Sequence, residues 1–134
     1  MITIKHKFVI KATAEIIFNA LTTQEGSSGW WAKQTIAKPE IGFVNEFTFG
    51  TVKNEIQVAD LVVDKKVVWK VLNAAPDWNG TTISFDIEAK EDKAILRFAH
   101  ADWQTDGDFF AECNFAWARF MISLKSYCET GTPS

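Results

Sequence analysis

The sequence has little of what metal, redox or nucleic-acid chemistry requires. It contains two cysteines and two histidines in 134 residues, and none of them falls at an HxxxH, HxH or CxxC spacing. Such spacings place several ligands around one metal ion, so we expect neither a metal site nor a cofactor. The 14 basic residues are interspersed with 17 acidic ones, without a basic run that would follow a phosphate backbone. We therefore expect no nucleic-acid partner.

Long apolar runs are absent as well. No stretch approaches the roughly 20 apolar residues that cross a bilayer, and the first segment alternates and is charged, unlike a signal peptide. We expect no membrane insertion and a cytoplasmic location. Cys113 and Cys128 are about four turns apart in what we predict to be one helix, so their sulfurs cannot form a disulfide. Two reduced thiols fit a reducing compartment.

Large rings are plentiful instead. The chain has eleven phenylalanines and six tryptophans, and 47% of its residues are hydrophobic. A length of 134 residues predicts a single domain, 1–134, in which roughly two thirds of the unfolded surface can be buried. This number of rings exceeds what a minimal core needs, so either the core is very aromatic or some rings line a cavity.

Alternation of apolar and polar residues predicts an antiparallel sheet. In 2–11 the even positions, His6 included, share one face, which predicts a half-buried strand. Short reversals at 64–66 and 91–92 separate later runs and favour hairpins. The expected strands after the first are 44–50, 53–63, 66–73, 81–89 and 93–101.

Helical spacing appears in three places. Thr13 is a plausible N-cap for a short helix, and a second short piece over 24–32 is expected to be broken by Gly26 and Gly29. From about Asp106 apolar residues recur at three and four positions until Gly131, which predicts a long helix, and we expect the aspartates of 102–108 to cap it. Only this helix is long enough to cover the apolar face of the sheet.

Four stretches carry a resemblance to a known superfamily. They are KATAEIIFNALT (11–22), Trp30-Trp31 followed by Pro39 and Gly42, VVWKV (67–71), and HADW (100–103) together with the segment 117–131. The chain resembles the START/SRPBCC helix-grip proteins, and within them the domain named after the activator of heat-shock protein 90 ATPase. One departure is Asp102, where that group often has glycine, and it can alter the loop backbone.

The resemblance implies an α+β helix-grip fold. In that fold a curved antiparallel sheet of about six or seven strands wraps around a long C-terminal helix, and two short helices follow the first strand. It also implies a hydrophobic cavity between sheet and helix. Relatives bind lipids, sterols or polyketides, or serve as protein-interaction modules, and some are cyclases or hydrolases. A shared fold does not choose among these functions.

Two polar residues stand on apolar faces of the predicted strands. His100 aligns with Leu96 and Phe98, and it is either a cavity group that orients a ligand or moves a proton, or a core histidine with satisfied hydrogen bonds. Asp60 aligns with Ile56 and Val58 in a regular strand, where its pKa would be raised. The alternative for Asp60 is a bulge that turns it to solvent.

We predict a binding domain that holds a hydrophobic small molecule (lipid-, sterol- or polyketide-like) between sheet and C-terminal helix, with no dedicated catalytic residue. Two alternatives stay open: a chaperone-interacting module, and a cyclase- or hydrolase-type enzyme that uses His100 or Asp60. The expected cavity residues are Trp31, Phe47, Phe49, Asp60, Trp69, Phe85, Phe98, His100, Trp103, Phe110, Trp117 and Phe120.

Overall fold

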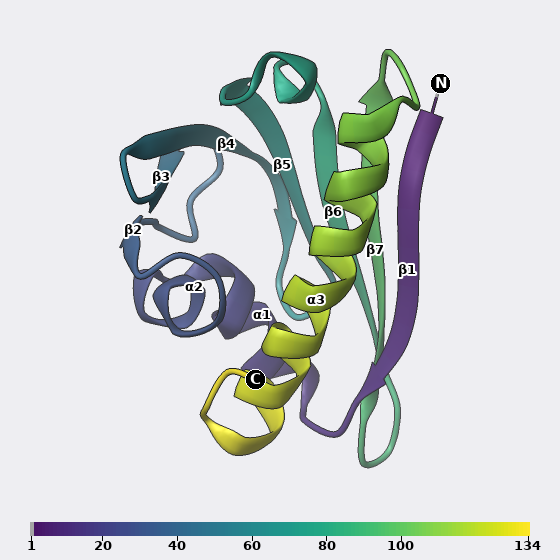
Figure 1. Ribbon diagram of the computed structural model, residues 1–134. Helices are drawn as coiled ribbons and strands as arrows, with labels where there is room; N and C mark the ends of the chain where they lie inside the picture. The colour runs from purple at the N-terminus through teal and green to yellow at the C-terminus, as the bar shows by residue number, and fades with distance from the viewer. Residues whose placement is uncertain (1) are drawn as a thin grey trace.

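One antiparallel sheet and a long helix packed across it make up the structure. The computed structural model describes residues 2–134, which form seven strands in the order β1-β7-β6-β5-β4-β3-β2 and three α-helices (Figure 1). The predicted helix-grip fold is confirmed. The elements are β1 (Ile2–Ile10), α1 (Ala14–Thr22), α2 (Gln24–Trp30), β2 (Gln34–Ile36), β3 (Val44–Phe49), β4 (Val52–Val62), β5 (Lys66–Asn73), the 3-10 turn η1 (Pro76–Trp78), β6 (Thr82–Ala89), β7 (Ala94–Trp103) and α3 (Asp108–Thr130).

The strands bury every second residue because helices cover only one face of the sheet. β2 to β7 pair in chain order as hairpins, and β1 lies beside β7 at one edge. Two elements were not predicted. β2 has only three residues, Gln34–Ile36, too few to show alternation, and η1 begins at Pro76 inside the connection between β5 and β6.

Short helices α1 and α2 begin at threonine caps. The Thr13 hydroxyl accepts a hydrogen bond from the Ile16 N–H at 3.2 Å, as predicted, and Thr23 accepts one from the Gly26 N–H at 3.0 Å. The expected break at the two glycines is wrong, since α2 is continuous. The reason is close packing: a Cβ at Gly26 would lie 2.6 Å from the Ala20 Cα, and one at Gly29 would lie 2.3 Å from the Tyr127 ring.

The ends of α3 follow one prediction and contradict another. Gly131 ends the helix at φ +84°, and its N–H donates to the Tyr127 carbonyl at 2.8 Å. At the start the N-cap is Gly107, without a side-chain cap, so no aspartate caps the helix; Asp108 lies in the first turn instead. Cys113 and Cys128 both lie on α3 without a disulfide within residues 2–134, and burial raises the pKa of Cys128 to about 12.

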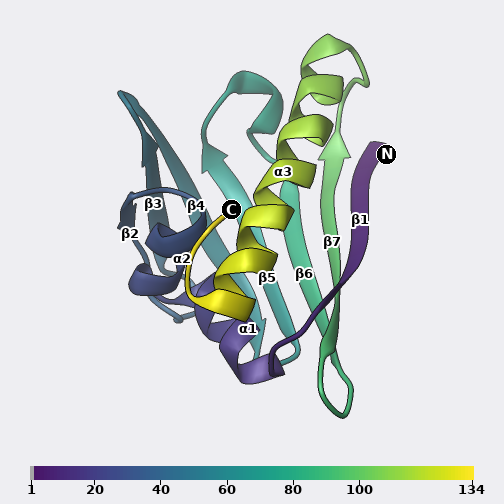
Figure 2. The same cartoon turned by 60° about the horizontal axis from the view of Figure 1, so that its bottom comes forward.

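Helix α3 crosses the concave face of the sheet diagonally, and its C-terminal half packs beside α1 and α2 (Figure 2). Aromatic rings fill the space between helix and sheet. The Phe98 ring centre lies 4.6 Å from that of Trp117 on α3 and 5.3 Å from that of Phe85. None of the helices among residues 2–134 is both long and apolar enough to cross a membrane.

Candidate functional site

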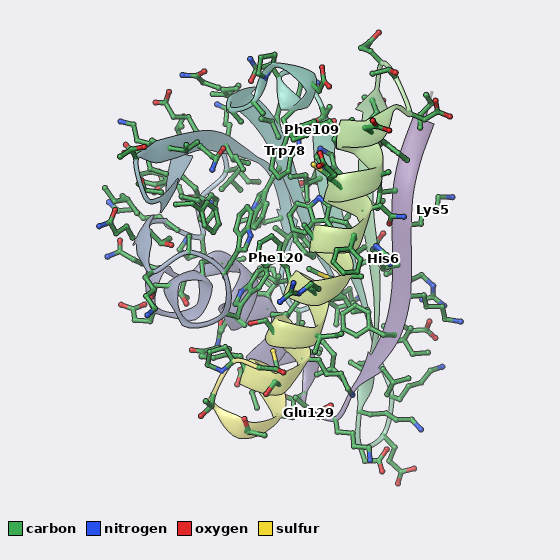
Figure 3. All side chains as sticks on the ribbon, in the orientation of Figure 1. Lys5, His6, Trp78, Phe109, Phe120 and Glu129 are labelled. Carbon is green, nitrogen blue, oxygen red and sulfur yellow. The ribbon has the colours of Figure 1, made fainter. Side chains whose placement is uncertain are left out.

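A cleft of about 360 Å³ opens at one end of the aromatic interior. It lies where the β3–β4 hairpin, the β5–β6 connection and the N-terminal half of α3 approach one another. In Figure 3 the labelled rings of Phe109 and Phe120 come from α3, and Trp78 lies beside Phe109. The lining residues are Trp31, Phe49, Val52, Lys53, Asn54, Ala74, Ala75, Trp78, Phe109 and Phe120.

Local sequence explains why this end stays open. Strand β5 ends at Asn73, and two alanines follow, Ala74 and Ala75, whose side chains are too small to fill the space in front of them. Pro76 then begins η1, which brings the Trp78 ring over the interior, 5.7 Å from the Trp117 ring and stacked on it. The cleft is therefore a gap between a short aromatic turn and a helix.

Few of the residues that line this cleft carry polar groups. Trp31 is only 8% exposed, and its indole Nε1 has no hydrogen-bond partner among residues 2–134. Asn54 is also buried, and its Nδ2 donates to the Phe47 carbonyl at 3.1 Å. Lys53 contributes the one charge of the lining, and its Nζ pairs with Glu46 Oε1 at 3.5 Å. The site is thus apolar and nearly neutral.

His100 is fully buried outside the cleft, and both ring nitrogens are occupied. The Trp117 indole N–H donates to Nδ1 at 3.0 Å, so Nε2 carries the ring proton and donates to the Thr81 hydroxyl at 2.7 Å. Thr81 donates in turn to the Trp78 carbonyl at 2.5 Å. Burial lowers the pKa of His100 to about 3, so the ring is neutral. This arrangement corresponds to the core-histidine alternative and leaves no nitrogen free for a ligand.

Asp60 lies on the outside, as the alternative of a bulge expects, and this corrects its place among the expected cavity residues. The register between β4 and β5 shifts between Val58 and Asp60, and this bulge ends the alternation that put Asp60 in line with Ile56. The carboxylate is exposed, and its Oδ1 accepts a hydrogen bond from the Leu61 N–H at 2.9 Å.

The remaining predicted cavity residues divide into three groups. Trp31, Phe49 and Phe120 line the cleft. Trp103 and Phe110 pack against each other, with ring centres 5.1 Å apart, and do not line it. The others fill the core between sheet and helix: Phe47, Trp69, Phe85, Phe98 and Trp117.

Sequence reasoning missed several cleft residues. Trp78 lies in a connection without periodicity, and Asn54 reads as one polar residue in an ordinary strand. Ala74 and Ala75 carry no chemical signal at all. The one usable signal is Pro76, which directly precedes Asp77 and Trp78. A proline fixes the backbone and so indicates a rigid turn at this place.

Asp102, the departure from the resembling group, keeps a glycine-like backbone. Its φ is +71°, in the left-handed region that favours glycine. The Thr82 hydroxyl donates to Asp102 Oδ2 at 3.1 Å and helps hold this conformation. Asp102 therefore lies within β7 and not in a loop, at the irregularity where the β1–β7 register shifts between Ile2 and Ile4.

A second apolar surface lies on the outer side of α3. Phe115 is 68% exposed and Ile122 is 57% exposed. The Arg119 guanidinium lies 6.0 Å from the centre of the Phe115 ring. A hollow of about 410 Å³ adjoins this surface, and Phe120 lines both this hollow and the cleft. We call Phe115, Arg119 and Ile122 the outer face of α3.

Comparison with known proteins decides the family. Residues 11–129 match the family described as Activator of Hsp90 ATPase homolog 1-like protein. The chain belongs to this family. No curated protein matches it.

Solved structures agree with this membership. The Aha1 dimer of Colwellia psychrerythraea, known from a solution structure, is 37% identical over 98% of both chains, with a TM-score of 0.90. Protein SSP2350 of Staphylococcus saprophyticus is 18% identical, with 99% of this chain and 96% of that one covered and a TM-score of 0.84. A conserved protein of unknown function from Enterococcus faecalis, EF2215, is 16% identical over 98% and 74%, with a TM-score of 0.81.

Family membership and the geometry of the site together limit the chemistry that this chain can perform. Within residues 2–134 no group of three or more histidine, cysteine or acidic side chains could hold a metal ion. The solved structures at 16–18% identity show only that the fold is shared, and they carry no argument about a ligand. What this member offers on its own is an aromatic cleft at one end of the helix grip.

Proposed function

We propose that this member of the activator-like family binds a small hydrophobic molecule in the cleft. The observation that carries the proposal is the cleft itself, which has a volume of about 360 Å³ and is lined by five aromatic rings, among them the buried Trp31. Ligand sites are typically concave and mostly apolar, with a few polar groups. Binding would gain about 25 cal/mol for each Å² of apolar surface buried, before the costs of ordering.

The volume supports a compact ligand. Ligand pockets span roughly 300–1,000 Å³, and this cleft lies near the lower end. The larger space that a sterol or a long acyl chain needs is occupied by the protein's own rings, among them Phe47, Trp69 and Trp117. We therefore narrow the expected lipid-, sterol- or polyketide-like class to molecules of one to a few rings. His100 and Asp60 lie outside the cleft, so the proposal includes no reaction step.

A substitution that fills the cleft with a larger side chain tests this proposal. Ala75→Phe puts a ring into the space, and Phe115→Ala changes an exposed ring outside it. We expect 2-acetylnaphthalene, followed by quenching of tryptophan fluorescence, to bind the wild type and Phe115→Ala alike and to lose at least about tenfold in affinity for Ala75→Phe. Equal affinity for all three proteins would contradict binding at this place. Native mass spectrometry of protein taken from cells then identifies what occupies it.

A second candidate function is a chaperone-interacting module. The family is named for activators of Hsp90 ATPase, and the outer face of α3 exposes Phe115 and Ile122 away from the cleft. Exposed apolar side chains of this kind are typical of protein contacts.

Binding to an Hsp90-type chaperone tests this second function. We expect Phe115→Ser to abolish co-sedimentation and any stimulation of ATPase activity, while Ile36→Ser, a change of another exposed apolar residue on β2, leaves both intact. The related Colwellia protein is a dimer, so sedimentation of this chain alone shows first whether a second copy covers the same face. If the two variants do not differ in co-sedimentation or in ATPase stimulation, this candidate function is removed.

A further inference from the structure

Strand β1 leaves one border of the sheet unpaired. Among residues 2–134 it pairs with β7 alone, so its other side faces outwards (Figure 1). An edge strand presents a row of N–H and C=O groups to which another strand can bind. Proteins that recognise peptides by strand addition use such an edge.

Two contacts with α3 show which residues of β1 point outwards. In a strand the N–H and C=O groups of one residue point to the same side, and successive residues alternate. The Val9 carbonyl accepts a hydrogen bond from Lys125 Nζ at 2.7 Å, and the Lys11 N–H donates to another side chain of α3 at 2.7 Å. The odd positions therefore face away from β7. Helix α3 covers the edge from Val9 onwards, and the outward groups of Lys5 and Lys7 have no partner within residues 2–134.

An apolar groove lies next to this edge, between β1 and α3. Its volume is about 240 Å³, and it is lined by His6, Lys7, Phe8, Ala118, Met121, Ile122 and Lys125. Ile122 is 57% exposed, so part of this apolar lining is uncovered. In Figure 3 the His6 label lies between β1 and α3, whereas Lys5 extends away from α3. An added strand would continue the sheet around α3 and would direct every second side chain towards the groove.

Charge selects the kind of strand that fits. Strand β1 contains Lys5 and Lys7 and no acidic residue, in a chain whose net charge is -3. Both lysines are exposed, and neither forms an ion pair within residues 2–134. Opposite charges side by side on neighbouring strands are favourable, and like charges are unfavourable. The lysines therefore oppose antiparallel pairing with the β1 of a second copy and favour a strand that carries acidic residues.

We propose that the β1 edge binds an extended acidic segment of a partner protein as an eighth, antiparallel strand. Its acidic side chains lie beside Lys5 and Lys7, and its apolar side chains, at the alternate positions, lie in the groove against Phe8 and Ile122. Main-chain hydrogen bonds supply affinity, and the alternation supplies specificity. The groove shares no lining residue with the aromatic cleft, so this site is independent of the proposed ligand.

A synthetic peptide tests the proposal on the unaltered chain. The peptide has seven residues, in which glutamate alternates with valine or isoleucine, and both ends are capped. We expect it to slow hydrogen exchange at the Lys5 and Lys7 amides, measured by NMR. The His6 and Phe8 amides point to β7 and should exchange slowly with or without it. A peptide of the same composition, with its glutamates and apolar residues in two separate blocks, should protect neither lysine amide.

Charge reversal tests the recognition of acidic residues. The double variant Lys5→Glu/Lys7→Glu should lower the affinity for the peptide by at least about tenfold and should bind a version with lysine in place of glutamate. The matched control is Lys33→Glu/Lys65→Glu, which changes the net charge equally at two other exposed positions. It should keep the wild-type affinity to within about twofold. Equal losses in the two double variants would contradict recognition at β1.

Methylation of the peptide backbone tests strand addition itself. In the antiparallel arrangement the glutamate N–H groups point to β1, and those of the apolar residues point outwards. N-methylation of the glutamates should therefore abolish binding, whereas N-methylation of the apolar residues should leave it largely intact. Equal binding of the two methylated peptides would overturn the proposal. So would protection of the Lys5 and Lys7 amides when the protein alone is concentrated, because a second copy would then occupy the edge.

Discussion

Two regions of the same aromatic interior differ in how completely their side chains fill the space. In the closed region, formed by Thr81, Phe85, Phe98, His100 and Trp117, each ring nitrogen has a partner and the rings leave no cleft between them. Elsewhere in the same aromatic layer, where Trp31 contacts Trp117 at a ring-centre distance of 5.4 Å, five rings line a cleft of about 360 Å³. A shared layer of tryptophan and phenylalanine thus builds a filled core at one place and a receptive surface at another.

This difference separates the aromatic rings that fill the core from those that line a space for a ligand. Packing at native density leaves no space for a ligand, and paired polar atoms offer it nothing to bind. The aromatic layer opens into a cleft beside two small side chains, Ala74 and Ala75. If this comparison is right, changes in the closed region act on stability, and changes around the cleft act on binding.

The largest effect is expected at the centre of the closed region. Trp117→Ala removes a fully buried ring and leaves His100 Nδ1 without its donor. We expect the free energy of unfolding to fall by about 3–5 kcal/mol, measured by urea denaturation. Phe115→Ala, on the same helix but exposed, should stay within about 0.5 kcal/mol. A loss below about 1 kcal/mol at Trp117 would mean that the region is not closed.

The second-largest effect is expected at low pH, where the protein should lose stability through His100 in the closed region. Burial lowers the pKa of His100 from 6.5 to about 3. Below pH 6.5 the imidazole is therefore protonated in the unfolded chain but stays neutral in the folded chain. The stability that the neutral His100 contributes to the folded state is fully present above pH 6.5. It is lost as the pH falls towards 3, at about 1.4 kcal/mol per pH unit. Between pH 8 and pH 5 the wild type should therefore lose about 2 kcal/mol more than His100→Asn does.

That variant serves as the matched control. His100→Asn is expected to be less stable at every pH because Trp117 and Thr81 lose their partner. Only the slope is compared, and the carboxylates that titrate in the same range cancel between the two proteins. Parallel curves for the two proteins would show that His100 is reached by solvent in the folded state.

The closed region could be predicted from sequence far better than the cleft. Alternation placed Phe85, Phe98 and His100 on one face, and helical spacing placed Trp117 opposite them, because burial imposes these periods on regular elements. Asp60 escaped this logic, since a bulge changes the face without leaving a mark in the local pattern. Gly26 suggested a helix break, yet its role is close contact between helices, which depends on a distant part of the chain.

The cleft depends on features that periodicity does not encode. Trp78 arrives from a non-periodic turn, and Ala75 acts by being small, which a sequence cannot show without knowing what lies opposite. The orphaned donor of Trp31 is a property of the packed structure, because any of the six tryptophans could have lacked a partner. Residues that line an opening are therefore found only once the elements are in place.

Phe120 is the residue whose removal should change the cleft most at moderate cost. It is half-buried and lines both the cleft and the hollow beside Trp30. Phe120→Ala should lower the free energy of unfolding by about 1–2 kcal/mol, less than for a fully buried ring, and should join the two spaces. The joined space should then admit pyrene, which we expect the wild type to exclude, as followed by pyrene fluorescence.

Phe109→Ala provides the comparison, because that ring lines the cleft alone. It should ease entry of naphthalene-sized ligands without admitting pyrene. If Phe120→Ala gains no affinity for pyrene, the two spaces are separated by more than one ring, and the cleft is more rigid than the contrast with the closed region implies.

The smallest effect is expected at Asp102, where the closed region ends. Its φ of +71° is strained for most side chains but tolerable for aspartate, and the Thr82 hydroxyl offsets part of that strain. Asp102→Gly removes the strain and the hydrogen bond together, so the free energy of unfolding should change by less than about 1 kcal/mol. Asp102→Val keeps the backbone requirement with a β-branched side chain and should cost about 1–2 kcal/mol. Equal stability of the glycine and valine variants in urea would show that the backbone of β7 adjusts freely at this register shift, and that this end of the closed region is not rigid.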